Sequence, residues 1–280
     1  MTRIAAKHVV ITGAASGIGR LMASRMADLG AAVTMLDLNE DSLARAVEQI
    51  RDASGRARGY TCDVSDKEAV ARVAREIVEE VGPVDILVNN AGVVSGGWLL
   101  DLTDEQIERT FGVDALALFW MTRAFLPAMI ERDAGHIVNV ASAAGLIGTC
   151  EQTDYAGSKH AAVGFDEALR MELRRLAPHV RNTVVCPYYI DTGMFAGVRT
   201  RFPWLLPILK EDQVASRIVR AVEHNQRRVV IPWVVRVVPI LREVLPLPIF
   251  DRLVDALGVN DTMSQFIGRK KTAIGARGVT

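Results

Sequence analysis

The sequence predicts a single-domain α/β fold, a doubly wound, Rossmann-like parallel sheet of seven strands with helices on both faces. Short runs rich in β-branched residues alternate with longer amphipathic segments, which is the pattern of a parallel sheet whose strands are joined by helices. A glycine-rich turn, Gly13 to Gly19, lies between the first run and the first helical pattern. The chain has 280 residues, half of them hydrophobic, which is enough for one large domain.

The individual elements follow from hydrophobic periodicity and from the turns between them. Right-handed crossovers between the strands would make this order a doubly wound sheet. A main Rossmann-like domain is expected over residues 1–232, followed by a C-terminal apolar extension over 233–280. The expected strands lie near 8–12, 31–36, 57–62, 84–88, 136–141, 181–186 and 228–231. The expected helices lie near 17–29, 40–52, 66–81, 104–110, 114–131, 155–176 and 211–224.

Composition narrows the class of protein. With 33 basic and 33 acidic side chains, the formal net charge is zero, so the chain has no electrostatic footprint for nucleic acid. The three cysteines, Cys62, Cys150 and Cys186, lack the spacing of metal ligands, and we expect neither a metal site nor disulfides. No secretory signal precedes the first expected strand. A reducing cytoplasm is therefore the expected compartment.

The glycine turn has the spacing G-x-x-x-G-x-G, formed by Gly13, Gly17 and Gly19, with Ser16 and Ile18 inside it. Such a turn lets a pyrophosphate approach the backbone, while the helix N-terminus offers N–H groups and the positive end of its dipole. The spacing differs from G-x-G-x-x-G, and a plain glycine-rich turn is the alternative. Together with the rest of the chain, the turn favours a dinucleotide site.

A carboxylate follows the second expected strand. Asp37 can accept hydrogen bonds from the hydroxyls of an adenosine ribose, and it would repel a 2′-phosphate. Ser16 and Leu38, where a 2′-phosphate binder often carries Arg or Lys, are not basic. These residues favour NAD over NADP. The alternative is that Asp37 only caps the helix that begins near Asn39.

The chemistry is predicted by three residues. Tyr155 and Lys159, four residues apart, project from the same face of an expected helix. A free tyrosine has a pKa of about 10, so a neighbouring ammonium is needed to favour its phenolate at neutral pH. Ser142 ends the apolar run HIVNVAS, which places its hydroxyl at the crevice where open α/β sheets bind ligands. Although Y-x-x-x-K alone occurs by chance on amphipathic helices, its combination with the dinucleotide turn predicts Tyr155 as a general base.

Taken in order, these motifs resemble the short-chain dehydrogenase/reductase family over residues 8–232. The resemblance implies that Tyr155 is the base, that Ser142 orients the substrate oxygen, and that Lys159 also binds the nicotinamide ribose. It further implies cofactor contacts at Asp63 and Val64 by the adenine, at Asn90, Ala91 and Gly92 in the turn NNAG, and at Pro187, Ile190 and Thr192 by the nicotinamide.

The segments FWMTRAFLPAM, GHIVNVASAAG and DTGMF are similar to the branch that contains retinol dehydrogenase 10 and the 17β-hydroxysteroid dehydrogenases 11 and 13. This resemblance implies large apolar alcohols, such as retinoids or steroids, as substrates. That branch commonly carries an N-terminal apolar anchor, which we do not expect here because the first strand begins near residue 8. The resemblance also implies a homodimer or homotetramer that pairs through helices 114–131 and 155–176, although their apolar faces could instead only cover the sheet.

Two positions depart from the family pattern. Asp114 stands where the family usually has the Asn that holds a water linking the lysine to solvent. The carboxylate could pair with Lys159 or take up a proton in a dry site, so we expect the relay to survive in altered form. The alternative is an aspartate without a catalytic part. Tyr188 replaces the glycine of a Pro-Gly pair, and its ring is expected to line or to narrow the substrate pocket.

Substrate choice is expected to depend on two apolar segments. Residues 193–210 follow Thr192 and can fold as a lid over the nicotinamide, which would exclude water. Residues 233–257 are interrupted by prolines and charges, so a bilayer span is not expected. One interpretation is a tail that packs over the substrate cleft or against a neighbouring subunit. The alternative is an amphipathic surface in peripheral contact with a membrane. The expected substrate contacts are Leu146, Cys150, Tyr188, Phe195 and Trp204.

The sequence thus predicts an NAD-dependent oxidoreductase that interconverts a lipophilic alcohol and its carbonyl through Ser142, Tyr155 and Lys159, with Asp114 beside them. Two alternatives remain open, a carbonyl reductase of a more polar substrate and a catalytically silent protein that senses NAD. An extended-family epimerase is disfavoured, because it would need a larger C-terminal substrate domain.

Overall fold

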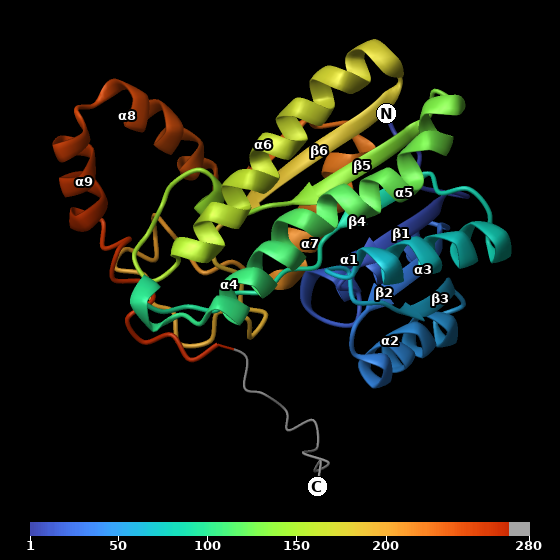
Figure 1. The fold of residues 1–280 in the computed structure, drawn as a ribbon, viewed down its shortest axis with the longest axis horizontal. Coiled ribbons are helices and arrows are strands. Elements are labelled where there is room, and N and C mark those ends of the chain that lie inside the picture. Colours follow the sequence, from blue (N-terminus) through green and yellow to red (C-terminus); the bar gives the residue numbers. More distant parts are fainter. Residues whose placement is uncertain (269–280) are drawn as a thin grey trace, which may run out of the picture.

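A parallel sheet of seven strands, in the order β3-β2-β1-β4-β5-β6-β7, organises the structure, a computed structural model that describes residues 1–268 (Figure 1). The order reverses between β1 and β4, and this switch point creates the crevice in which such sheets bind ligands. The strands are β1 (His8–Thr12), β2 (Ala32–Asp37), β3 (Arg56–Thr61), β4 (Ile86–Asn89), β5 (Gly135–Val140), β6 (Val180–Pro187) and β7 (Arg228–Ile231).

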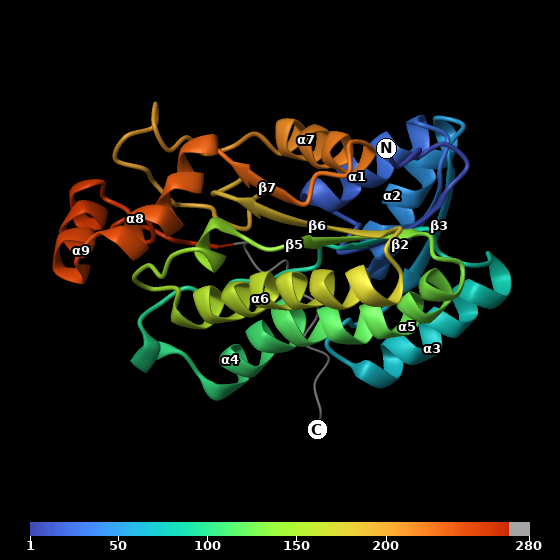
Figure 2. The same cartoon turned by 90° about the horizontal axis from the view of Figure 1, so that it is seen from above.

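Helices cover both faces of this sheet (Figure 2). Helices α1, α2 and α7 lie on one face, and α3 to α6 lie on the other. Their bounds are α1 (Gly17–Asp28), α2 (Glu40–Asp52), α3 (Lys67–Glu80), α4 (Asp104–Phe111), α5 (Ala117–Glu131), α6 (Thr153–Leu176), α7 (Glu211–Glu223), α8 (Val238–Val244) and α9 (Leu247–Ala256). The predicted doubly wound fold is therefore confirmed.

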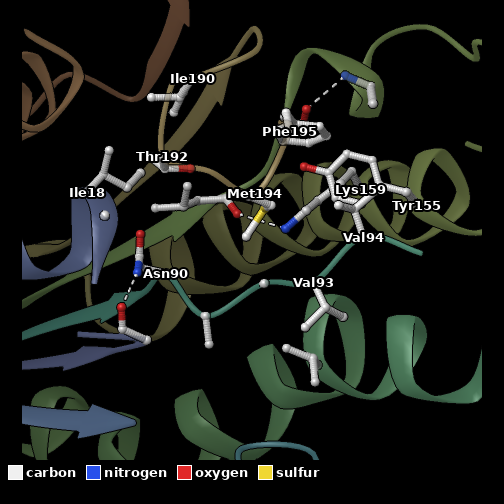
Figure 3. A pocket seen from close by; sticks show the side chains of 18 of the residues that line it. Ile18, Asn90, Val93, Val94, Tyr155, Lys159, Ile190, Thr192, Met194 and Phe195 are labelled. Atoms are coloured by element: carbon white, nitrogen blue, oxygen red, sulfur yellow. Dashed lines mark hydrogen bonds between the residues drawn. The ribbon is translucent and has the colours of Figure 1, made fainter. Parts of the chain in front are cut away.

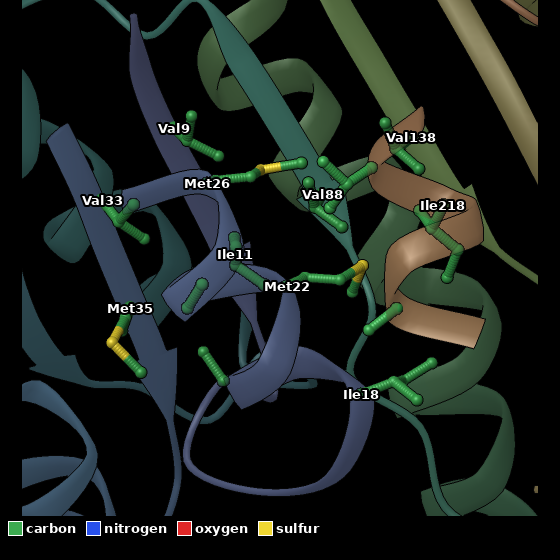
Figure 4. Close-up of a cluster of buried hydrophobic side chains, with 14 of the residues drawn as sticks. Val9, Ile11, Ile18, Met22, Met26, Val33, Met35, Val88, Val138 and Ile218 are labelled. Atoms are coloured by element: carbon green, nitrogen blue, oxygen red, sulfur yellow. The ribbon is translucent and has the colours of Figure 1, made fainter. Parts of the chain in front are cut away.

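The core is divided by the sheet into two apolar layers, because a parallel sheet buries both of its faces. On the α1 and α7 side, Met22, Met26 and Ile218 pack onto the side chains of the central strands (Figure 4). On the other side, Met121 and Met129 of α5 pack against the strands. This packing fixes the positions of the strands, and the site lies at their carboxyl ends.

Helices α4 and α5 form one continuous stretch, where the sequence predicted two separate helices. A π-helical turn, Gly112–Leu116, joins them, and it contains Asp114. Single π turns inside helices occur often at functional sites. Among the described residues, the combined helix Asp104–Glu131 is long and apolar enough to cross a membrane. It packs here against α3 and α6, as a helix of a protein core does.

The C-terminal extension has two parts. A 3₁₀ turn (Trp233–Val237) with α8 and α9 stands beyond the carboxyl ends of the strands (Figure 1). Residues 259–268 then return toward the sheet, where several of them line the cavity described below. The extension was predicted to reach residue 280, and its residues 269–280 lie outside the described part of the chain.

Candidate functional site

The glycine turn after β1 is packed so closely that it excludes side chains. A Cβ on Gly19 would lie 2.2 Å from the carbonyl oxygen of Gly13, and a Cβ on Gly13 would lie 2.8 Å from Cα of Ala91. The Asn90 side chain donates hydrogen bonds to the carbonyl oxygens of Thr12 and Gly13 at 2.9 and 3.1 Å. The turn that follows β4, which contains Asn90, therefore supports the glycine turn from the inside. The outer surface of the glycine turn remains open to a ligand.

Asp37 is oriented by the same turn. Its Oδ2 accepts a hydrogen bond from the backbone N–H of Ala15 at 3.0 Å, and its Oδ1 accepts one from Asn39 at 3.0 Å. The alternative role as a helix cap is wrong, because the Asn39 side chain accepts from Ser42 and caps α2 itself. Leu38 is exposed beside the carboxylate, with no basic side chain in its place.

A cavity of about 830 Å³ opens along the carboxyl ends of the strands (Figure 3). It gathers every residue predicted to contact the cofactor, together with Ser142 of the predicted catalytic set. Asp114 does not line it and lies behind Lys159. The lining residues that the sequence predicted for the cofactor are Gly13, Ser16, Gly17, Ile18, Gly19, Asp37, Leu38, Asp63, Val64, Asn90, Ala91, Gly92, Tyr155, Lys159, Pro187, Ile190 and Thr192.

Tyr155 lies in the first turn of α6, because this helix begins at Thr153 rather than at the predicted residue 155. Its phenol is buried beside Ser142, which is positioned by the 3.1 Å hydrogen bond that its Oγ accepts from the Ala144 N–H. Burial raises the pKa of the Tyr155 phenol above its ordinary 10, and the charge of Asp114 raises it further. The hydrogen bond with Ser142 lowers this pKa and so opposes both effects.

Lys159 is buried with a carboxylate. Its Nζ lies 3.3 Å from Oδ2 of Asp114 and donates a hydrogen bond to the Val140 carbonyl oxygen at 3.4 Å. Oδ1 of Asp114 accepts the Val93 N–H at 2.8 Å. Burial raises the pKa of Asp114, whereas the ammonium of Lys159 and the Val93 N–H lower it.

The lowering of the Tyr155 pKa that was predicted for Lys159 is opposed by burial of the phenol. The Nζ of Lys159 lies 5.5 Å from the centroid of the Tyr155 ring, and the nearby carboxylate of Asp114 offsets its charge. Burial is the largest cause of the raised pKa of Tyr155, and the charge of Asp114 adds to it. The pairing of Asp114 with Lys159, one of the two possibilities that the sequence left open, is observed. The π turn that places Asp114 against the lysine was not predicted.

Three of the five residues predicted to contact the substrate do not line the cavity. Leu146 is buried in a core cluster under the site, because the short 3₁₀ turn before it directs its side chain inward. Cys150 does not line the cavity, and its N–H lies 3.4 Å from the Asn260 side chain. Trp204, in the segment 193–210 that was expected to form a lid, is 80% exposed and also lies outside the lining. Tyr188 and Phe195 do line the cavity, as predicted.

The part of the cavity around Tyr155 is largely apolar and aromatic. The ring of Phe195 packs edge-on against Tyr155 with centroids 5.8 Å apart, and the side chains of Val94 and Met194 lie close by (Figure 3). The residues predicted for the site did not include most of this wall, because most of its residues, Val113 of the π turn excepted, lie in loops without periodicity. The missed apolar residues are Val93, Val94, Val113, Ile147, Met194, Val259, Phe266 and Ile267.

Comparison with known proteins agrees with this geometry. The family profile described as "short chain dehydrogenase" matches residues 7–202. Epidermal retinol dehydrogenase 2 of Mus musculus is 41% identical over 270 residues, which cover 96% of this chain and 87% of the relative. Retinol dehydrogenase 10 of Xenopus tropicalis is 38% identical over 298 residues, with coverage of 96% and 87%.

Solved structures that are similar to this one include complexes with nicotinamide cofactors. A short chain dehydrogenase/reductase from Burkholderia phymatum in complex with NAD has a TM-score of 0.79 at 30% identity and covers 87% of this chain and 95% of its own. A metagenomic short-chain oxidoreductase in complex with NADP has a TM-score of 0.67 at 29% identity, with coverage of 79% and 92%. The chain therefore belongs to the short-chain dehydrogenase/reductase family and is an oxidoreductase that acts on alcohol groups, related to the retinol dehydrogenases.

Proposed function

We propose that this protein uses NAD to oxidise a lipophilic alcohol of retinoid, steroid or lipid type. The observation that carries the proposal is the position of Tyr155, which lies between the glycine turn and the apolar wall around Phe195. Retinol dehydrogenases among the relatives support the same substrate class. Reduction of the matching carbonyl uses the same side chains in the reverse direction.

The residues present fit NAD. The turn of Gly13 and Gly19 has no room for a Cβ, yet its outer surface lines the cavity, as a pyrophosphate site requires. Asp37 has its carboxylate fixed at the end of β2, where it would accept hydrogen bonds from the ribose hydroxyls. The exposed Leu38 beside it offers no charge to a 2′-phosphate, which supports NAD rather than NADP.

The chemistry at the alcohol is divided among the side chains of the site. When bound, NAD supplies the hydride acceptor and a positively charged ring. Tyr155, as phenolate, accepts the hydroxyl proton at its Oη, and Ser142 orients the alcohol oxygen through its Oγ. Lys159 contributes positive charge that favours the phenolate, although Asp114 offsets part of it. The apolar wall around Phe195 excludes water from the reacting atoms.

The proposal is tested by NADH fluorescence with purified protein, either NAD or NADP, and a panel of retinol, steroid alcohols, long-chain alcohols and short polar alcohols. We expect turnover of apolar alcohols with NAD, and its loss in Tyr155→Phe. Turnover confined to polar carbonyls would support the reductase alternative. Binding of NAD without turnover of any alcohol or carbonyl would support the sensing alternative.

We also propose that the protein is a cytoplasmic enzyme whose C-terminal extension rests on a membrane surface. Exposed apolar side chains recur at helical spacing on one side of the 3₁₀ turn and α8, while Val235 and Leu241 on the opposite side pack inward. Such a one-sided face suits the boundary between headgroups and acyl chains. The exposed residues on this face are Trp233, Val237, Ile240 and Val244, and Leu247 and Ile249 at the start of α9 are exposed as well.

We infer that two copies associate through the outer sides of α5 and α6. Leu116 and Phe119 at the start of α5 and Met171 of α6 remain exposed, although the sheet is already covered by these helices. The rings of Phe119 and Phe165 pack 4.6 Å apart and join the two helices into one surface. Sedimentation velocity would test this, with a dimer or tetramer expected for the native chain and dissociation expected for Phe119→Glu. A native chain that sediments as a monomer would contradict it.

A further inference from the structure

Residues 259–268, here called the C-terminal strap, form a wall of the cavity. Val259, Phe266, Ile267 and Gly268 line it, far along the chain from the glycine turn and from Tyr155. Helices α8 and α9 stand away from the cavity, so the strap is the only part of the extension, within the described residues, that lines it. The path of the chain therefore returns to the site after leaving it.

A buried network of polar side chains attaches the strap to the N-terminal end of α6, the helix that carries Tyr155. The hydroxyl of Tyr189 lies 2.8 Å from Oγ1 of Thr262 and donates to the side-chain oxygen of Gln152 at 3.4 Å. The amide of Gln152 donates in turn to the sulfur of Met263 at 3.3 Å. Gln152 directly precedes α6, three residues before Tyr155. The strap is thus fixed in position relative to Tyr155, the proposed base.

Backbone contacts fix the strap to the lid as well. The N–H of Ile267 donates to the Ala196 carbonyl oxygen at 2.9 Å, and the N–H of Arg199 donates to that of Thr262 at 3.2 Å. A Cβ on Gly197 would lie 2.0 Å from the carbonyl oxygen of Gln265, so only glycine permits this approach. The lid and the strap consequently form one connected wall.

The ring of Phe266 is held against a second glycine. A Cβ on Gly96 would lie 2.4 Å from Cε1 of Phe266, and Gly96 has a positive φ of 69° that other residues rarely adopt. Phe266 packs in one apolar cluster with Val94 and Phe195, and Phe195 contacts the Tyr155 ring. A continuous apolar surface therefore runs from the base to Phe266.

We propose that Phe266 determines which length of substrate the site accepts, because its ring closes the end of the apolar pocket that lies opposite Tyr155. Gly96 and the polar network of Gln152 and Tyr189 act as positioning residues for this ring. This inference rests on the proposed function, because it assigns the end of the same alcohol site. The ligand is an alcohol with an elongated apolar body, whose hydroxyl lies at Tyr155 and whose far end abuts the Phe266 ring.

The test compares Phe266→Ala with the native protein on a homologous series from hexan-1-ol to hexadecan-1-ol and on retinol. We expect the ratio of kcat/KM for the longest alcohol to that for the shortest to rise by about tenfold or more in the variant, because a removed ring admits additional methylenes. The control is Trp204→Ala, since Trp204 is an exposed aromatic residue outside the cavity. This control should leave the ratio unchanged.

A second variant tests the positioning of the strap without changing the wall. Tyr189→Phe removes the hydroxyl that holds Thr262 and Gln152. It should raise KM for long alcohols several-fold and leave kcat nearly unchanged, because the base remains in place. A fall in kcat alone, with the same KM, would show that the polar network only supports α6. This result would overturn its role in positioning the strap.

The outcomes separate this inference from the proposed function. If the native protein oxidises alcohols and Phe266→Ala leaves the length ratio unchanged, or lowers all alcohols equally, the inference is wrong and the proposed function stands. If no alcohol is oxidised, the proposed function is wrong. The thermal shift that each alcohol causes then decides the inference, which requires a larger gain for long alcohols in Phe266→Ala than in Trp204→Ala.

Discussion

The ammonium of Lys159 lies 3.3 Å from the carboxylate of Asp114, and both side chains are buried. In this family the lysine is expected to support the tyrosine base, and a carboxylate against it changes the electrostatic balance. Burial is the largest cause of the raised pKa of Tyr155, and the negative charge of Asp114 raises this pKa further. The proton affinity of Tyr155, the proposed base, therefore depends on a neighbour behind the cavity.

Asp114→Asn should shift the pH dependence of alcohol oxidation toward lower pH. In the proposed mechanism oxidation needs the phenolate of Tyr155, so the rate should rise as the pH passes through the pKa of that group. Removal of the carboxylate removes a cause of the raised pKa, and the rising limb should therefore move to lower pH. The profile of kcat/KM against pH measures this. An unchanged limb would exclude an electrostatic role for Asp114.

Lys159→Met should destabilise the protein by about 3 to 5 kcal/mol near neutral pH, because it leaves the buried Asp114 carboxylate without its partner. Burial raises the pKa of Asp114, so a carboxyl without its cation is favoured in the protonated form. The loss should therefore shrink as the pH falls and grow as it rises. Urea denaturation at several pH values measures it.

The double variant Lys159→Met with Asp114→Asn is the control for this prediction. It has no buried unpaired charge, and it should recover part of the lost free energy of unfolding. A double variant as unstable as the sum of the two single variants would show that the two side chains do not interact energetically.

Gly19→Ala should abolish or strongly weaken NAD binding. The added methyl would lie 2.2 Å from the Gly13 carbonyl oxygen and 2.6 Å from Nδ2 of Asn90, so the turn must move. Gly164→Ala is the matched control, because a Cβ there meets nothing within 4 Å and Gly164 lies inside α6. The control should bind NAD normally and gain about 0.5 to 1 kcal/mol of stability. Calorimetric titration with NAD, together with thermal unfolding, distinguishes the two variants.

The sequence predicted the parts of the site that short motifs determine. The glycine turn, Asp37 and the pair of Tyr155 and Lys159 each lie within one strand end or one helical turn. Their relative positions follow from local geometry together with the rule that strand ends meet at one edge of a parallel sheet. For the same reason the strands and the helices of the main domain were predicted closely, since each has a clear hydrophobic period.

The substrate side could not be predicted in the same way. Leu146 and Trp204 are apolar and near the motifs, but one is directed into the core and the other into solvent. Phe266 lies on a loop with no period, and only the return of the chain after α9 brings it to the cavity. The pairing of Asp114 with Lys159 was foreseen as one possibility, whereas the π turn that contains Asp114 was not, because no sequence spacing signals it.

Replacing Asp37 by Ser and Leu38 by Arg should move the cofactor preference from NAD toward NADP. The double variant removes a carboxylate that would repel a 2′-phosphate and adds a guanidinium that can bind it. The ratio of the two dissociation constants should change by at least about tenfold, since a hydrogen bond to a charged group contributes about 1.5 to 3 kcal/mol. Titration of NADH and NADPH fluorescence measures this ratio. A native protein that already prefers NADPH would contradict the role given to Asp37.

The double variant Trp233→Ser with Val244→Ser should weaken binding to vesicles of phosphatidylcholine and phosphatidylserine by about tenfold or more, because each large apolar side chain contributes about 1.5 to 3 kcal/mol when it leaves water. Co-flotation with the vesicles measures the bound fraction. Leu29→Ser is the control, because Leu29 is also exposed but follows α1 on another part of the molecule. Absence of co-flotation for the native protein would overturn the proposed membrane contact. Equal losses in all variants would show that the contact does not depend on the extension.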